Sequence, residues 1–180
     1  MVYSQDGKLT KTIDLDNSRN PAGVAALQDG CMVGSDQDRC SCLLLQPDGS
    51  LIREIGKGQL QYPQFIAVDE SRDLFFVTDY GAHKVFVFDL EGNLKFSFGK
   101  HGKSEGLLEH PKGITLDPDG NIIVLNSEDR RLQVFKPDGT YMRTVANVKG
   151  RNPLGITLTP DGHIAVAHEY GNCVELYRYK

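Results

Sequence analysis

Four proline-led segments recur along the chain, and their spacing restricts the folds open to it. Pro21, Pro63, Pro111 and Pro153 each begin a short apolar run, and these prolines are 42, 48 and 42 residues apart. Acidic and glycine residues at tight turns separate further runs rich in valine, isoleucine, leucine and phenylalanine. Aspartate and glycine tolerate the positive φ angles that tight hairpins require. Because helical periodicity is absent, the pattern predicts short antiparallel β-strands.

Each of the first three repeats is long enough for four strands. The second repeat shows them as apolar runs at 63–69, 74–77, 85–88 and 94–98. Four strands in a repeat of this length are typical of a β-propeller blade. We therefore predict an all-β propeller of about four blades with four-stranded antiparallel sheets, in a single domain covering residues 1–180. The expected boundaries are a half blade at 1–15 and repeats at about 21–56, 63–99, 111–146 and 153–180.

The two ends of the chain have complementary patterns. Residues 2–13 match residues 134–145, which are the third strand, turn and fourth strand of a repeat. The last repeat ends after its third apolar run, at 174–177. Propellers avoid an exposed edge by exchanging a strand between the first and last blades. We therefore expect the N-terminal segment to complete the last blade.

The motifs inside the repeats identify a family. The second repeat carries Ile66-Ala-Val-Asp69, Val77-Thr-Asp79, His83-Lys84, Val87-Phe88 and Phe98-Gly99. The third carries Gly113-Ile-Thr-Leu-Asp117, Arg131-Leu-Gln-Val-Phe135 and Asp138-Gly139. These motifs resemble the NHL repeat family and, within it, the C-terminal propellers of tripartite-motif ubiquitin ligases. The resemblance implies a six-bladed ring, so we expect a partial or truncated propeller here.

Strand topology sorts the polar residues onto two faces. The hairpin turns share one face, where the acids are explained by turn chemistry. The loops between the second and third strands share the other face, the loop face, with the connections between blades, and this face gathers cations, imidazoles and tyrosines. The candidate partner-binding residues there are Tyr80, His83, Lys84, Arg130, Arg131, His168 and Tyr170. For Lys84 and Arg131 we favour structural ion pairs, such as Lys84 with Asp79. For Tyr80 and Tyr170 partner contact is as well supported as a structural role.

Catalysis and metal binding have little support in the sequence. The aligned loop positions are read as Ser35, Asp79, Asn126 and His168, and this variety is a poor ligand set for an ion on the propeller axis. The pair Cys40 and Cys42 has no second pair to form a zinc site. No arrangement of nucleophile and base stands out. We predict no catalytic residue, no metal and no cofactor.

Charge and hydropathy narrow the functional classes. The net charge of −4 lacks the basic footprint of a whole-domain nucleic-acid binder. No apolar stretch approaches a membrane span, and the N-terminus lacks the apolar core of a signal peptide, so we expect a cytoplasmic protein without a membrane partner. The resemblance implies a protein-binding scaffold, such as the substrate-recruiting propeller of a ubiquitin ligase. Single-stranded RNA binding is the alternative function, and a metal-dependent lyase or lactonase is less favoured. Exposed blade edges would also favour self-association.

Overall fold

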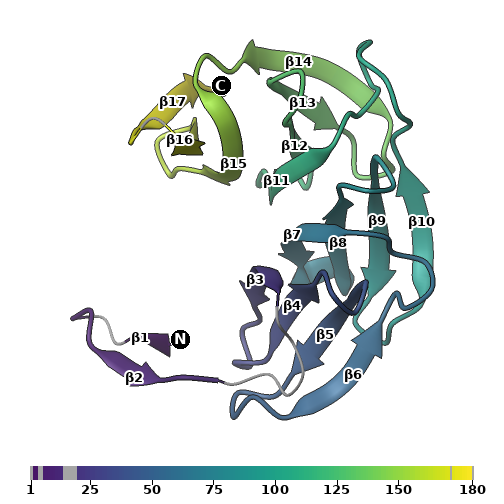
Figure 1. Cartoon of the computed structure of the whole chain (residues 1–180), viewed down its shortest axis with the longest axis vertical. Coiled ribbons are helices and arrows are strands. Elements are labelled where there is room, and N and C mark those ends of the chain that lie inside the picture. Colours follow the sequence, from purple (N-terminus) through teal and green to yellow (C-terminus); the bar gives the residue numbers. More distant parts are fainter. Residues whose placement is uncertain (1, 4–5, 14–19, 171, 180) are drawn as a thin grey trace.

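The computed structural model describes residues 2–3, 6–13, 20–170 and 172–179. Four antiparallel sheets follow one another around an open arc, as the colours along the chain show (Figure 1). Within the described residues the one helix is the single 3-10 turn η1 (Glu70–Arg72), and it is far too short to cross a membrane. The predicted all-β propeller with four-stranded antiparallel blades is therefore confirmed.

Each sheet is an up-and-down meander whose strands follow the sequence order. The first blade contains β3 (Pro21–Ala26), β4 (Met32–Asp36), β5 (Ser41–Leu45) and β6 (Leu51–Ile55). The second contains β7 (Pro63–Asp69), β8 (Leu74–Asp79), β9 (Lys84–Asp89) and β10 (Leu94–Phe98). The third contains β11 (Pro111–Leu116), β12 (Ile122–Asn126), β13 (Arg131–Phe135) and β14 (Tyr141–Asn147). The fourth contains β15 (Arg151–Leu158), β16 (His163–Tyr170) and β17 (Val174–Arg178).

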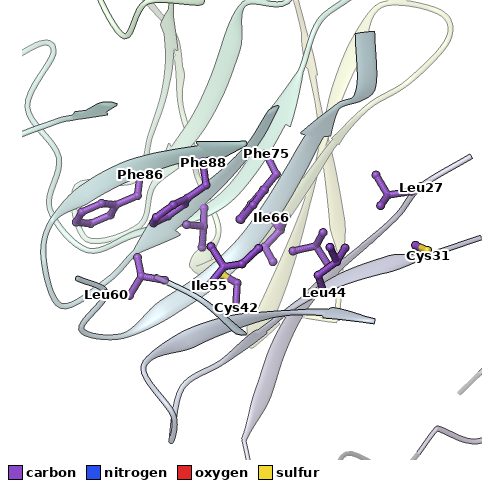
Figure 2. Packing of buried hydrophobic residues seen from close by; sticks show 12 residues of the cluster. Leu27, Cys31, Cys42, Leu44, Ile55, Leu60, Ile66, Phe75, Phe86 and Phe88 are labelled. Carbon is purple, nitrogen blue, oxygen red and sulfur yellow. The ribbon is translucent and has the colours of Figure 1, made fainter. Parts of the chain in front are cut away.

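The hydrophobic core lies between the blades rather than within them. Successive side chains of a strand point to opposite faces of its sheet. In β8, Phe75 and Val77 therefore pack toward the first blade, while Phe76 packs toward the third. Figure 2 shows Phe75 and Phe88 of the second blade beside Ile55 and Leu44 of the first. Because both faces of a middle blade are buried, its stability depends on its neighbours.

Glycines let the innermost strands approach one another. A Cβ on Gly23 of β3 would lie 2.4 Å from the Gln64 carbonyl oxygen of β7. A Cβ on Gly113 of β11 would lie 2.8 Å from the Ile156 nitrogen of β15. Both contacts are with backbone, so a larger side chain would push neighbouring blades apart.

Hydroxyl groups also join neighbouring blades close to these glycines. The Thr78 hydroxyl donates to the Lys112 carbonyl at 2.6 Å, and the Ser127 hydroxyl donates to the Pro153 carbonyl at 3.1 Å. Each bond links the second strand of one blade, or the loop that follows it, to the first strand of the next. The rotation between blades is thereby fixed at the end that carries the loop face.

The expected exchange of strands between the chain ends is not made. Strands β1 (Val2–Tyr3) and β2 (Leu9–Lys11) pair with each other in a separate two-stranded sheet, and the fourth blade stays three-stranded. The hairpin itself fits the match to a third strand, turn and fourth strand, but the four blades form an open arc, so the hairpin lies apart from β17 and cannot complete its sheet (Figure 1). Residues 1, 4–5, 14–15, 171 and 180 of the predicted repeats lie outside the described residues.

One sheet face at the end of the arc is left uncovered. Val174 and Leu176 of β17 are 64% and 63% exposed. Their equivalents in the second blade, Val85 and Val87, are fully buried against the third blade. The described chain therefore presents an apolar surface where a further blade would pack.

Candidate interaction site

A polar residue near the end of each second strand organises the loop face. Pairing with the repeat prolines identifies these residues as Asp36, Asp79, Asn126 and His168. The sequence alignment placed Ser35 at this position, and the strand register corrects it to Asp36. The difference arises because Asp36 follows Val33 by three residues, whereas Asp79 follows Val77 by two.

Asp79 holds the connection that enters its blade. Its carboxylate accepts backbone N–H bonds from Gln61 at 2.7 Å, Tyr62 at 3.0 Å and Ala82 at 2.9 Å. The predicted partner Lys84 makes no ion pair with it among the described residues. The Asp79 side chain therefore positions Tyr62 and the loop that follows β8.

Asn126 and His168 have the same role in the later blades. The Asn126 Oδ1 atom accepts the backbone N–H of Glu109 at 2.5 Å. The His168 ring is fully buried, with Nδ1 at 3.3 Å from the Arg151 carbonyl and Nε2 at 3.3 Å from a Glu175 oxygen. These polar atoms are engaged by the protein itself. No group of three histidine, cysteine or acidic residues in the described parts of the chain is arranged to hold a metal ion.

Five rings form a continuous series of contacts on the loop face, with one stacked pair at its centre. Tyr80 lies parallel to His110 at 4.1 Å between ring centroids, and Tyr62 meets the Tyr80 ring edge-on at 6.0 Å. His83 lies 4.4 Å from His110 and 4.3 Å from His101. We call these five residues the ring stack. It joins the loops of the second blade to the connection between the second and third blades.

The long connection at 99–110 is pinned to the third blade. The fully buried Gln133 accepts the Gly106 N–H at 2.8 Å and donates to the Leu107 carbonyl at 2.9 Å. Arg131 is paired with Asp129 and also donates to carbonyl groups of the connection. This supports the structural role favoured for Arg131. The connection, which makes this repeat six residues longer than its neighbours, is thus a fixed segment that carries His101 and His110.

The imidazoles of the ring stack are electrostatically coupled. The Nδ1 atom of His83 accepts the His110 backbone N–H at 3.1 Å, which assigns the ring proton of neutral His83 to Nε2. Burial, together with the charges of His110 and His101 when protonated, lowers the pKa of His83. His101 and His110 each face a glutamate, Glu109 at 3.7 Å and Glu128 at 4.0 Å.

Two adjoining recesses open beside the ring stack. The first, which we call the cationic recess, has a volume of about 420 Å³ and is lined by Tyr80, Lys112, Ser127, Glu128, Arg130, Arg151 and Asn152. The second, of about 590 Å³, is lined by Gln37, Tyr62, Gln64, Tyr80, Gly81, Lys112, Leu154 and Glu169. Both recesses share Tyr80 and Lys112, and the Lys112 ammonium lies 5.9 Å from the Tyr80 ring centroid.

The structure brings some of the predicted site residues together and separates others. Tyr80 and His83 lie in the ring stack, and the exposed Arg130 lines the cationic recess. Lys84 begins β9 outside both recesses, whereas His168 is buried as described above. Tyr170 is 62% exposed and pairs with Arg151 in the strand register.

The candidate residues from the sequence leave out five residues of the site. They are Tyr62, His101 and His110 of the ring stack and Lys112 and Arg151 of the cationic recess. The insertion of six residues before the third repeat was a usable signal for the two histidines. Lys112 and Arg151 gave no such signal, because their proximity depends on how two blades pack.

The opposite face is explained by its turns. The Asp48 carboxylate accepts hydrogen bonds from the Ser50 hydroxyl and N–H, which lower its pKa. The Asp138 carboxylate likewise accepts the Thr140 N–H, and its pKa is lowered. These acids stabilise their own hairpins, as expected for turn residues.

Comparisons with known proteins agree with this architecture. The family model for the NHL repeat matches residues 60–88 and 108–135. The chain is 33% identical over 89 residues to protein brain tumor of Drosophila melanogaster, covering 48% of this chain and 8% of that protein. It is 34% identical over 134 residues to the E3 ubiquitin-protein ligase TRIM71 of Mus musculus, covering 63% of this chain and 15% of that protein. The chain thus spans a small part of either relative.

Solved propellers share the fold at low sequence identity. A virginiamycin B lyase from Staphylococcus aureus, a catalytically inactive variant with quinupristin, aligns with a TM-score of 0.68 at 17% identity, over 98% of this chain and 61% of that chain. The WD40 β-propeller domain of Doa1 aligns with a TM-score of 0.69 at 16% identity, over 89% and 51%. At these identities the likeness shows the fold alone. With the repeat matches and the relatives above, the chain is an NHL-repeat β-propeller similar in sequence to TRIM71 and protein brain tumor.

Proposed function

We propose that the chain is a non-catalytic scaffold that binds a protein partner through its loop face. We further propose that it recruits substrates or partners for a tripartite-motif E3 ubiquitin ligase in the cytoplasm. The observation that carries the proposal is the ring stack beside the cationic recess, on a face whose loops are fixed by hydrogen bonds. Tyrosine and arginine are common anchors of protein interfaces.

The relatives support the ligase context. TRIM71 of Mus musculus is an E3 ubiquitin-protein ligase, and this chain corresponds to 15% of its length. A propeller of this size contributes recognition rather than transfer chemistry in our proposal. The polar groups near the strand ends support that view, because Asp79, Asn126 and His168 are committed to holding backbone or neighbouring side chains.

The proposal is tested by comparing variants of two faces in affinity purification with quantitative mass spectrometry. The loop-face variant is Tyr62→Ala/Arg130→Ala/Tyr170→Ala, which removes three exposed side chains. The matched control is Leu51→Ala/Lys136→Ala/Met142→Ala, which removes two exposed apolar side chains and one cation at the turn end of the outer strands. We expect the loop-face variant to lose co-purified proteins that the control retains. Equal retention by both variants would refute the proposal.

RNA binding remains the second candidate because the ring stack provides aromatic surfaces next to cations. Stacking of a base on an aromatic side chain contributes about 1–3 kcal/mol, and phosphate contacts make affinity depend steeply on salt. The test is fluorescence anisotropy with a labelled ten-nucleotide oligouridine at 50 and 200 mM salt. Binding at low salt that disappears at high salt supports this candidate, and no binding at 50 mM removes it.

A further inference from the structure

We infer that the cationic recess binds an anionic side chain, a carboxylate or a phosphate, presented by an extended segment of a partner protein. This inference rests on the proposed function and specifies the chemistry of the partner. It concerns three cations that no feature of the fold requires: Lys112 of β11, Arg130 in the β12–β13 loop and Arg151 of β15.

The three cations have no acidic partner among the described residues. None of them forms an ion pair there, whereas the neighbouring Arg131 is bound to Asp129. Arg130 and Arg151 are exposed, and each guanidinium can donate hydrogen bonds in a planar fork that fits a carboxylate or phosphate. The recess therefore has unused donor capacity for an anion.

The lining of the recess contains these three cations and one carboxylate, that of Glu128. A Glu128 carboxylate oxygen lies 4.0 Å from the Nδ1 atom of His110. The net positive character of the recess contrasts with the net charge of −4 for the chain. Since like charges elsewhere would repel an acidic partner, the local excess of cations also directs that partner to this part of the surface.

The walls of the recess are held in place before any partner arrives. Tyr80 is fixed by its parallel contact with His110, and Ser127 by its hydrogen bond to the Pro153 carbonyl. Arg130, in the turn before β13, and Asn152, near the start of β15, lie in the left-handed backbone region, with φ of 54° and 48°. A site that is already shaped loses less conformational entropy on binding.

The arrangement favours a peptide over a nucleic acid. A volume of about 420 Å³ accommodates one or two side chains, and the adjoining recess carries Glu169, which repels consecutive phosphates. An extended peptide presents its side chains alternately to two sides, so a single acid can enter the cationic recess while neutral residues follow. Its backbone N–H groups can donate to Glu128 and Glu169. The second recess, with Tyr62 and Leu154 in its lining, then receives an apolar part of the same segment.

The test is fluorescence anisotropy of the full chain with labelled nine-residue glycine-serine peptides. One peptide carries two glutamates, one carries two phosphoserines and one carries two glutamines. We expect an anionic peptide to bind at least about tenfold more tightly than the glutamine peptide, and its affinity to fall as salt rises. Binding of the phosphoserine peptide alone identifies phosphate as the source of the anion, and binding of the glutamate peptide identifies carboxylate.

Matched variants locate the binding. Arg130→Gln/Arg151→Gln is expected to weaken the anionic peptide about tenfold. Lys95→Gln/Lys136→Gln removes the same charge at the opposite face and is expected to change affinity less than about twofold. Equal affinity for all three peptides overturns the inference, as does an equal loss in both variants. Tighter binding of the ten-nucleotide oligouridine, lost in the arginine variant, overturns it in favour of RNA.

The outcome is separable from the proposed function. Circular dichroism and thermal unfolding of each variant show whether the fold is kept. If Arg130→Gln/Arg151→Gln retains the proteins that the three-site loop-face variant loses, the anion inference fails while loop-face binding stands. If neither variant loses proteins, the proposed function fails as well.

Discussion

Replacing Asp79 with alanine removes the group that builds the loop face of the second blade. The fully buried carboxylate accepts three backbone hydrogen bonds, from Gln61, Tyr62 and Ala82. A hydrogen bond to a charged group contributes about 1.5–3 kcal/mol, and the contributions of bonds to one carboxylate do not add fully. In the variant, water can accept some of the backbone N–H bonds that the carboxylate accepted, because Gln61 and Tyr62 lie on the exposed connection. We expect the free energy of unfolding to fall by about 3 kcal/mol.

Urea denaturation of the Asp79→Ala variant measures this loss, and hydrogen exchange locates it. The amides of Gln61, Tyr62 and Ala82 are expected to exchange faster, while amides of the fourth blade keep their protection. The control is Asp38→Ala, which removes an exposed acid from the same face and is expected to change stability by less than about 0.5 kcal/mol. A loss below about 1 kcal/mol with unchanged exchange at the three amides would refute the role given to Asp79.

Three further changes test other parts of the account. Burial raises the pKa of Asp117, but hydrogen bonds, including one from the Tyr179 hydroxyl at 2.7 Å, outweigh burial and lower the pKa overall. Tyr179→Phe is therefore expected to lower the free energy of unfolding, measured by urea denaturation at pH 7, by about 2 kcal/mol, and to lessen the stability lost on acidification. An unchanged free energy of unfolding would contradict the role of this bond. Because the pKa of His83 is lowered in the folded chain, stability should fall as the pH drops below the unfolded pKa of about 6.5. His83→Gln should therefore reduce the difference between the unfolding temperatures measured at pH 7.5 and 5.5. An unchanged difference argues against the coupling. The exposed Val174 and Leu176 should promote association between copies, so light scattering should show a mass that rises with concentration. The variant Val174→Glu/Leu176→Glu should have the mass of a monomer. A monomeric parent chain would contradict this prediction.

The strands were predictable because local chemistry determines them. The run at 74–77 lies within β8 (Leu74–Asp79), and the proline at 63 begins β7 (Pro63–Asp69), as the alternation and turn residues indicated. The blade order followed from the same repeat. Each of these features depends on residues close together in the chain, so sequence periodicity captures them.

The arrangement of the site depends on contacts between blades, which periodicity does not record. His110 stacks on Tyr80 because Gln133, in the third blade, holds the connection in place. Lys112 and Arg151 line one recess because two inner strands approach at Gly113. The pairing of β1 with β2 agrees with the match to a third strand, turn and fourth strand, whereas the expected pairing of this hairpin with the last blade is not made, because it depends on how far the arc closes.

Site-specific photocrosslinking tests the central claim, that a partner protein binds the loop face, most directly. The photoreactive residue p-benzoylphenylalanine replaces Tyr62 on the loop face in one variant and Met142 on the outer strand β14 in another. Both side chains are exposed to a similar extent, 39% and 43%. After irradiation in cells, we predict a covalent protein adduct at position 62 and none at position 142. An adduct at position 142 without one at position 62, or no protein adduct at either position, would contradict the account.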